Sequence, residues 1–148
     1  VNELNYVGVL GIEFFYGTKG LLINEIAPRT HNSAHFSIEA CSSSQFDQYI
    51  CIASGITPPE IKMNCEGSIM INLLGLKKNF PTSIDTRVKL LSKIKGSNLH
   101  WYGKSKEILG RKMAHITFLL NEKSHFKRFE ESKEILIKVR DIWPSPNP

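Results

Sequence analysis

At 148 residues the chain is long enough to bury one core, or two small ones packed together. Its composition, 41% hydrophobic and 22% charged, is ordinary for a soluble globular protein. The net charge of +5 is modest and its carriers are scattered, whereas a nucleic-acid binder usually shows a dense basic stripe with interleaved aromatics. No apolar run approaches the length that crosses a bilayer. We therefore expect neither a nucleic-acid partner nor a membrane partner.

The cysteines and the first residue give two further expectations. The three cysteines contain no CxxC pair and leave an odd count, which argues against a disulfide framework and favours a reducing cytoplasm. The chain begins with Val1 rather than Met, without the basic start and apolar run of a signal peptide. We therefore expect an N-terminal part to be missing from this sequence.

In the first third of the chain the pattern predicts a hairpin followed by a helix. Residues 3–6 indicate the end of a helix, and residues 7–16 and 21–26 form two β-rich runs around the turn 17–20, which predicts an antiparallel hairpin. A polar loop over 27–35 follows. Residues 45–53 are predicted to form a helix, with N-cap hydroxyls at 42–44 and Gly55 as its stop.

The rest of the chain is predicted to form a second, small domain. The Thr57-Pro58-Pro59 run is the strongest boundary signal, so the predicted domains are 1–57 and 58–148. Beyond it the patterns predict strands over 68–75, 99–102 and 113–120, helices over 83–95 and 124–142, and a loop over 103–110. The predicted fold class is α+β.

A pair of carboxylates in the predicted hairpin is the sharpest chemical feature. Glu13 and Glu25 interrupt otherwise apolar strands, where an unpartnered carboxylate is costly. If both face one side they could share divalent cations, because magnesium prefers carboxylate oxygens, water and phosphates. Asn24 adds a neutral oxygen, although strand alternation would place it on the opposite face from Glu25. On spacing alone, ion pairs with a nearby Lys or Arg are the commoner explanation.

The loop after the second predicted strand favours the metal interpretation. Arg29, His31 and Asn32 follow Glu25 within a few residues. An arginine there can hold a planar anion through paired hydrogen bonds, and an amide can complete the cradle. The alternative is a capped loop whose His and Asn satisfy backbone groups. Metal, phosphate and a second anion held side by side would explain the carboxylates and the basic loop together.

These residues carry a family resemblance. The run Asn-Glu-Ile-Ala-Pro-Arg-Thr-His-Asn-Ser at 24–33, with the strand at 6–15 before it, resembles the 5-(carboxyamino)imidazole ribonucleotide synthetase family of the ATP-grasp superfamily. The matches continue in order with Ser-Gln-Phe at 44–46, Met-Ile-Asn-Leu-Leu-Gly at 70–75, His-Trp-Tyr-Gly-Lys at 100–104 and Gly-Arg-Lys-Met-Ala-His at 110–115. The first run is specific, whereas a glutamate pair alone would fit any ATP-grasp enzyme.

The resemblance implies the C-terminal part of an ATP-grasp domain, built on an antiparallel sheet with helices, followed by a small α+β domain. It implies an ATP-dependent carbon–nitrogen ligase of purine biosynthesis, cytoplasmic and homodimeric, that carboxylates 5-aminoimidazole ribonucleotide with bicarbonate through carboxyphosphate. On this basis ATP and Mg²⁺ are the expected cofactors. In the family a nucleotide-binding first domain and the lid over ATP precede the region seen here, and both are expected to be missing from this sequence. Alone, the chain is expected to be inactive.

The resemblance also implies a role for each candidate residue. It makes Glu13 and Glu25 the metal ligands, with Asn24 and Glu25 at the nucleotide. It makes Arg29, His31 and Asn32 the catalytic group around bicarbonate or carboxyphosphate, with Arg29 and Asn32 also binding substrate. From the second domain, the cations expected to bind the phosphate of the ribonucleotide are Lys104, Arg111 and Lys112. Their alternative is an ordinary solvated surface loop.

Three alternatives remain open. A biotin-dependent carboxylase would share the glutamates and the following arginine, but the wording of the run at 27–33 argues against it. A non-catalytic module that binds phosphate esters or a partner protein would have kept the distal half of the fold, but the intact set of Glu13, Glu25 and Arg29 argues against long decay. Nucleic-acid binding is the weakest option. Departures from the family pattern at Ala34, Cys51 and Ala114 leave every proposed ligand in place, and their effect on activity is not fixed by the sequence.

Overall fold

The computed structural model describes residues 2–77 and 80–146. The chain divides into two compact units, residues 1–64 and residues 65–148, which are taken in turn. The domain assignment 1–57 and 58–148 stays a prediction. Within the described residues no helix is both long and apolar enough to cross a membrane.

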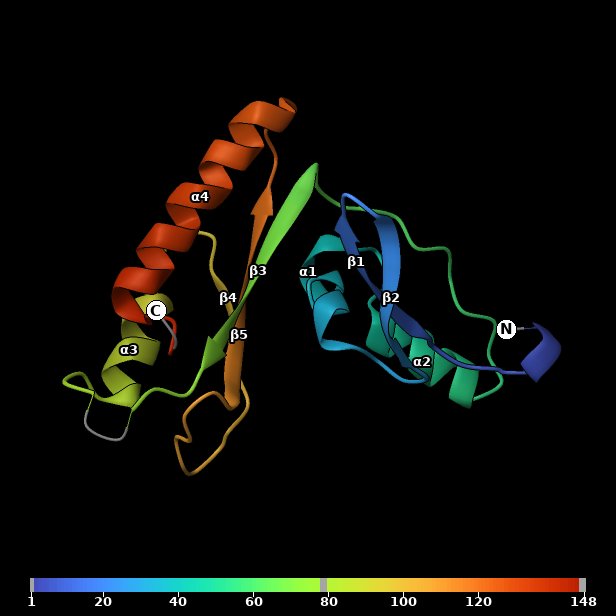
Figure 1. The fold of residues 1–148 in the computed structure, drawn as a ribbon, viewed down its shortest axis with the longest axis horizontal. Helices are drawn as coiled ribbons and strands as arrows, with labels where there is room; N and C mark the ends of the chain where they lie inside the picture. Colours follow the sequence, from blue (N-terminus) through green and yellow to red (C-terminus); the bar gives the residue numbers. More distant parts are fainter. Residues whose placement is uncertain (1, 78–79, 147–148) are drawn as a thin grey trace. The chain divides into compact units, whose positions relative to one another are not determined.

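The first unit is built on the predicted hairpin. Strands β1 (Gly11–Gly17) and β2 (Gly20–Ala27) pair antiparallel around a tight turn, and Gly20 there has a φ of +83°, which favours glycine. Figure 1 shows the two strands as the blue ribbon of this unit. The prediction that the first strand begins at Val7 is wrong, because β1 begins at Gly11. A short 3₁₀ helix, η1 (Asn2–Leu4), occupies the region predicted to end a helix.

Three short helical elements follow the hairpin: η2 (Asn32–Ala34), α1 (Ser37–Ala40) and α2 (Gln45–Ala53). The bounds of α2 confirm the prediction because the cap is strong. The Ser44 hydroxyl accepts from the Asp47 amide, and the Asp47 carboxylate accepts from the Ser44 amide, which completes a capping box. After the helix, Gly55 adopts a φ of +69°.

The second unit is a three-stranded antiparallel sheet with two helices. Strands β3 (Gly67–Leu74), β4 (Asn98–Trp101) and β5 (Lys112–Leu120) are ordered β3-β5-β4, with β5 in the centre. Helices α3 (Ile84–Leu91) and α4 (His125–Ile142) complete the unit, and α4 runs along the sheet (Figure 1). Helix α3 ends earlier than predicted, with Ser92 as its C-cap. The α+β fold class is confirmed.

The core of the second unit lies between the sheet and the helices. Its central strand, β5, is buried almost throughout, as expected for a strand that is paired on both edges. Trp143, just after α4, is fully buried and donates from its indole nitrogen to the Leu74 carbonyl at 2.7 Å. The buried hydrophobic residues of this core are Ile71, Leu73, Leu76, Leu91, Met113, Ala114, Ile116, Phe118, Val139 and Trp143.

Candidate functional site

A bulge in the hairpin brings the two glutamates together. Glu13 pairs directly with Glu25 across the strands, whereas the next residue, Phe14, pairs with Ile23. Asn24 is therefore the extra residue of the bulge, and its amide donates to Glu13 Oε2 at 3.2 Å. The expectation from strict alternation, that Asn24 faces away from this carboxylate pair, is wrong for this reason.

His31 completes a cluster of potential metal ligands. Its Nδ1 lies 3.5 Å from Glu13 Oε1, and its Nε2 lies 3.9 Å from Glu25 Oε2. One donor atom from each of the three residues lies within 4.8 Å of the others. The imidazole side chain is only 12% exposed, whereas those of Glu13 and Glu25 are 34% and 47% exposed. Carboxylate oxygens at this separation fit a divalent cation such as magnesium.

The position of His31 depends on a glycine and on a cap. A Cβ at Gly11 would lie 2.8 Å from the Cβ of His31, so only glycine at this place in β1 lets the histidine approach. His31 is also the N-cap of η2: its Nδ1 lies 2.8 Å from Ser33 Oγ and accepts from the Ser33 amide at 3.3 Å. The alternative interpretation, a histidine that caps the loop, is thus also realised.

Arg29 lies at the open side of the same cluster. Its Nη2 is 3.7 Å from Glu25 Oε1, and its Nη1 donates to the Thr30 carbonyl at 3.0 Å. The side chain is 63% exposed, so the pair with Glu25 is weak and the guanidinium can meet a small anion. Asn32 opens η2, adjacent to His31 in the chain. The structure therefore brings Glu13, Asn24, Glu25, Arg29 and His31 together in the first unit.

The predicted phosphate-binding cations form a separate group in the second unit. Lys104 donates from Nζ to the Lys112 carbonyl and lies 5.4 Å from the centre of the Tyr102 ring. Arg111 and Lys112 are exposed. The loop between β4 and β5 packs closely against the backbone of Gly75, because a Cβ at Gly75 would overlap the Ile108 carbonyl oxygen. The Gly75 amide donates to the Arg111 carbonyl at 2.8 Å, and the Gly110 amide donates to the Gly75 carbonyl at 2.9 Å.

Tyr102 connects this loop to the core of its unit. Its hydroxyl lies 2.6 Å from Nδ1 of the buried His115, whose ring stacks on His100 with a centroid separation of 4.5 Å. Burial raises the pKa of Tyr102 above its usual range, so the phenol keeps its proton near neutral pH. The pair supports the ring against which Lys104 lies.

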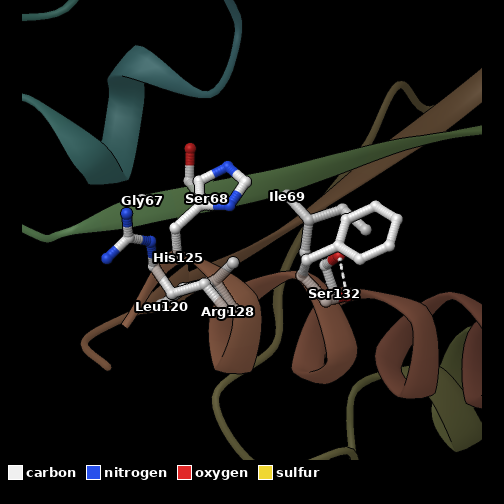
Figure 2. A pocket seen from close by; sticks show the side chains of 8 residues that line it. Gly67, Ser68, Ile69, Leu120, His125, Arg128 and Ser132 are labelled. Atoms are coloured by element: carbon white, nitrogen blue, oxygen red, sulfur yellow. Dashed lines mark hydrogen bonds between the residues drawn. The ribbon is translucent and has the colours of Figure 1, made fainter. Parts of the chain in front are cut away.

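The second unit also has a pocket near helix α4. Figure 2 shows a pocket of about 260 Å³ between the start of β3 and the first turns of α4, and Arg128 is its main cation. The Arg128 guanidinium donates from Nη1 to the carbonyls of Glu122 and Lys123, both at 2.7 Å. Ser132, labelled in the same view, donates to the Phe129 carbonyl. Arg128 Nη1 and the Ser132 hydroxyl are thus bonded to the protein itself.

Fold and site together define the class. A hairpin that carries two facing carboxylates, followed by an arginine–histidine loop, is the distal part of an ATP-grasp domain, and the ATP-grasp family model matches residues 1–46. A model described as the phosphoribosylaminoimidazole carboxylase C-terminal domain matches residues 68–128. The chain belongs to the N5-carboxyaminoimidazole ribonucleotide synthase family, whose C-terminal part it matches.

Individual relatives agree along nearly the whole chain. An N5-carboxyaminoimidazole ribonucleotide synthase of Synechococcus elongatus is 39% identical over 99% of this chain. The synthetase of Thermus thermophilus is 35% identical over 96% of this chain, with a TM-score of 0.74. A structure from Aspergillus clavatus, in complex with ADP and 5-aminoimidazole ribonucleotide, is 29% identical over 89% of it, with a TM-score of 0.72. The chain spans 37%, 35% and 35% of these three proteins.

Sequence reasoning missed two residues of the site. The sequence pattern places Gly11 only within a strand and Gln45 only within the Ser-Gln-Phe run of the resemblance. In the structure Gln45 is buried, and its amide bonds to both backbone groups of His31. A polar residue at the first position of a capped helix gives no signal of a partner 14 residues earlier in the chain.

Proposed function

We propose that the full-length protein uses ATP and bicarbonate to carboxylate the amine of 5-aminoimidazole ribonucleotide. The observation that carries the proposal is the facing pair of Glu13 and Glu25, with His31 and Arg29 beside it. Family membership supports it, and the relative with ADP and the ribonucleotide bound supports the choice of substrates. The cytoplasm as the site of action and a homodimer as the assembly are part of the same proposal.

The reaction consists of two transfers. Bicarbonate oxygen attacks the γ-phosphorus of ATP, which forms carboxyphosphate and releases ADP. The amine nitrogen of the ribonucleotide then attacks the carboxyl carbon, a nitrogen–carbon bond forms, the carbon–oxygen bond to phosphate breaks, and the amine gives up a proton. Magnesium, when bound, would supply positive charge at the ATP phosphates.

The first unit would supply the residues around the transferred groups. Glu13 and Glu25 would hold magnesium through carboxylate oxygens, and Asn24 orients Glu13 by its hydrogen bond while lying at the nucleotide. Arg29 and Asn32 would hold bicarbonate or carboxyphosphate by paired hydrogen bonds. His31, next to both carboxylates, would hold the same anion and is placed to take a proton.

The second unit would bind the phosphate of the ribonucleotide. Lys104 and Arg111 lie in the loop before β5, Lys112 is the first residue of β5, and Lys104 donates a hydrogen bond to the Lys112 carbonyl. Each charge-assisted hydrogen bond to phosphate contributes about 1.5–3 kcal/mol, or roughly 10- to 100-fold in affinity. Lys104→Met is therefore expected to raise KM for the ribonucleotide by about that factor, whereas Lys106→Met, on the same loop, is the matched control.

The test of the proposal is ADP release by the full-length protein in the presence of bicarbonate, with and without the ribonucleotide. Release that depends on the ribonucleotide and disappears in Glu25→Gln supports both the reaction and the metal role. Glu60→Gln is the control, because the Glu60 carboxylate is exposed and pairs with Lys62. A wild-type protein that binds ATP and phosphate esters without turnover would favour a non-catalytic binding module instead. The 148-residue chain alone is expected to release no ADP.

A further inference from the structure

A buried amide connects helix α2 to the histidine of the candidate site. Gln45, the first residue of α2, is 7% exposed. Its Oε1 accepts from the His31 amide at 2.7 Å, and its Nε2 donates to the His31 carbonyl at 2.9 Å. One side chain thus bonds both backbone groups of a single residue. Its Nε2 also lies 2.7 Å from Nδ1 of His35.

The two hydrogen bonds from the Gln45 side chain to the backbone of His31 are called the Gln45 clamp below. Further hydrogen bonds fix Gln45 itself. The backbone amide of Gln45 donates to Ser37 Oγ at 3.0 Å, and the Ser37 hydroxyl donates to the Ala34 carbonyl at 2.6 Å. The capping box at Ser44 fixes the helix end from which Gln45 projects. Because buried polar networks whose members are all bonded are rigid, the loop and the helix start form one hydrogen-bonded body.

The clamp determines where the imidazole of His31 lies. His31 has an extended backbone (φ −123°, ψ 146°) as the N-cap of η2, where its carbonyl also accepts from the Ala34 amide at 3.1 Å. With its backbone fixed by Gln45 and its Cβ against Gly11, the ring comes within 3.5 Å of Glu13 and 3.9 Å of Glu25. A shift of about 1 Å at such a group is enough to cost about two orders of magnitude in rate.

We propose that Gln45 is a positioning residue, whose amide holds the His31 imidazole at the Glu13–Glu25 pair. Gln45 acts through the backbone of His31 and makes no contact with substrate. The kinetic consequences rest on the proposed function, whereas the placement of the ring does not.

The kinetic test compares two glutamines of the same helix in the full-length protein. Gln45→Met keeps volume and removes both bonds to His31. Gln48→Met is the matched control, because Gln48 also anchors α2 to a loop, donating to Ser43 Oγ at 2.9 Å and to the Pro59 carbonyl at 2.8 Å. We expect Gln45→Met to lower kcat about 10- to 100-fold, with the Kd of ATP within about twofold of wild type. We expect Gln48→Met to keep the wild-type kcat.

A spectroscopic test is independent of turnover. Mn²⁺ bound at Glu13 and Glu25 should broaden the NMR signals of the His31 ring, which are assigned through their loss in His31→Asn. We expect equal broadening in wild type and Gln48→Met, and clearly weaker broadening in Gln45→Met. Circular dichroism of all variants checks that α2 remains folded.

The outcomes separate the two proposals. A wild-type protein without ribonucleotide-dependent ADP release contradicts the proposed reaction but leaves the broadening comparison valid. Equal kcat and equal broadening in Gln45→Met and wild type overturn the positioning role, as do equal losses in Gln45→Met and Gln48→Met. Should Gln45→Met not fold, Gln45→Glu replaces it: the new carboxylate still accepts from the His31 amide but cannot donate to the carbonyl, and a wild-type kcat and broadening there would also overturn the role.

Discussion

The two units of the chain place their apolar side chains in opposite ways. In the second unit a sheet and two helices bury eleven of the hydrophobic residues that the structure describes, including Trp143 and Leu73 at 0% exposure. In the first unit the buried hydrophobic residues are two alanines, Ala27 and Ala40, among the residues described. Its hairpin instead exposes apolar side chains along both strands: Ile12, Phe14, Phe15, Tyr16, Leu21, Leu22, Ile23 and Ile26.

The difference shows two ways of holding a functional residue in place. Neighbouring residues of a strand point to opposite faces, and since Leu21 and Leu22 are 65% and 53% exposed, both faces of the hairpin are open in this 148-residue chain. A two-stranded hairpin of this kind is marginally stable. The Glu13–Glu25–His31 cluster in the first unit therefore depends on directed polar contacts, such as those of Gln45 with His31, whereas the Lys104 loop rests on a packed core.

The largest expected effect is on the core of the second unit. Trp143→Ala removes the fully buried indole and its hydrogen bond to Leu74, and should lower the free energy of unfolding by about 3–5 kcal/mol. Phe15→Ala, an aromatic truncation on the exposed hairpin, should change it by less than about 1 kcal/mol. Urea denaturation monitored by circular dichroism measures both. Similar losses in the two variants would contradict the comparison.

A buried ion pair gives the next largest effect. The Arg87 guanidinium, 1% exposed, pairs with Glu107 Oε2 at 2.8 Å and stacks 4.0 Å from the centre of the Trp143 ring. Glu107→Gln leaves the buried cation without its counter-charge and should cost about 3 kcal/mol in the same denaturation experiment. Adding Arg87→Met should restore part of the loss, since the cation is then gone. A double variant less stable than Glu107→Gln alone would show that the pair is not the cause.

In the first unit a smaller effect is expected at the site itself. Gly11→Ala places a Cβ 2.8 Å from that of His31 and should cost about 1–3 kcal/mol in local stability, together with lower turnover, because the histidine must shift. Gly17→Ala lies on the same strand and meets nothing within 4 Å, so it is the matched control. Thermal unfolding and ADP release by the full-length protein test both. Equal activity in the two variants would contradict the proposed packing of His31.

The sequence predicted elements well where local signals were strong. The bounds of α2 follow from its Ser44 cap and the stop at Gly55, and the hairpin follows from its glycine turn. It failed where tertiary contacts decide: the run from Val7 is β-rich, yet pairing begins at Gly11, opposite the end of β2. The sequence pattern also gave the wrong face of the strand for Asn24, because the bulge turns its side chain to the face of Glu13. It gave no role for Gln45, because its partner His31 lies 14 residues earlier in the chain.

The smallest expected effect is the pH dependence of the α2 cap, on which the Gln45 clamp rests. The Asp47 carboxylate accepts from the Ser44 amide and from the Ser44 hydroxyl, both at 2.8 Å, and these bonds lower the pKa of Asp47 below its usual value. A lowered pKa stabilises the folded state above the usual aspartate pKa, and this contribution is lost as pH falls through the folded-state value.

In Asp47→Asn, helix α2 should therefore be less stable than in wild type at neutral pH. In acid the stability of α2 should become the same in the two proteins. Amide exchange in α2 at several pH values measures the difference, and Asp141→Asn on α4 controls for the change in net charge. If the difference in amide exchange rates of α2 between wild type and Asp47→Asn stays constant across the acid range, the charge of the carboxylate does not contribute to the cap. In that case the start of the helix is held by the Ser44 hydroxyl and by the contact of Gln45 with Ser37 rather than by the charge of Asp47.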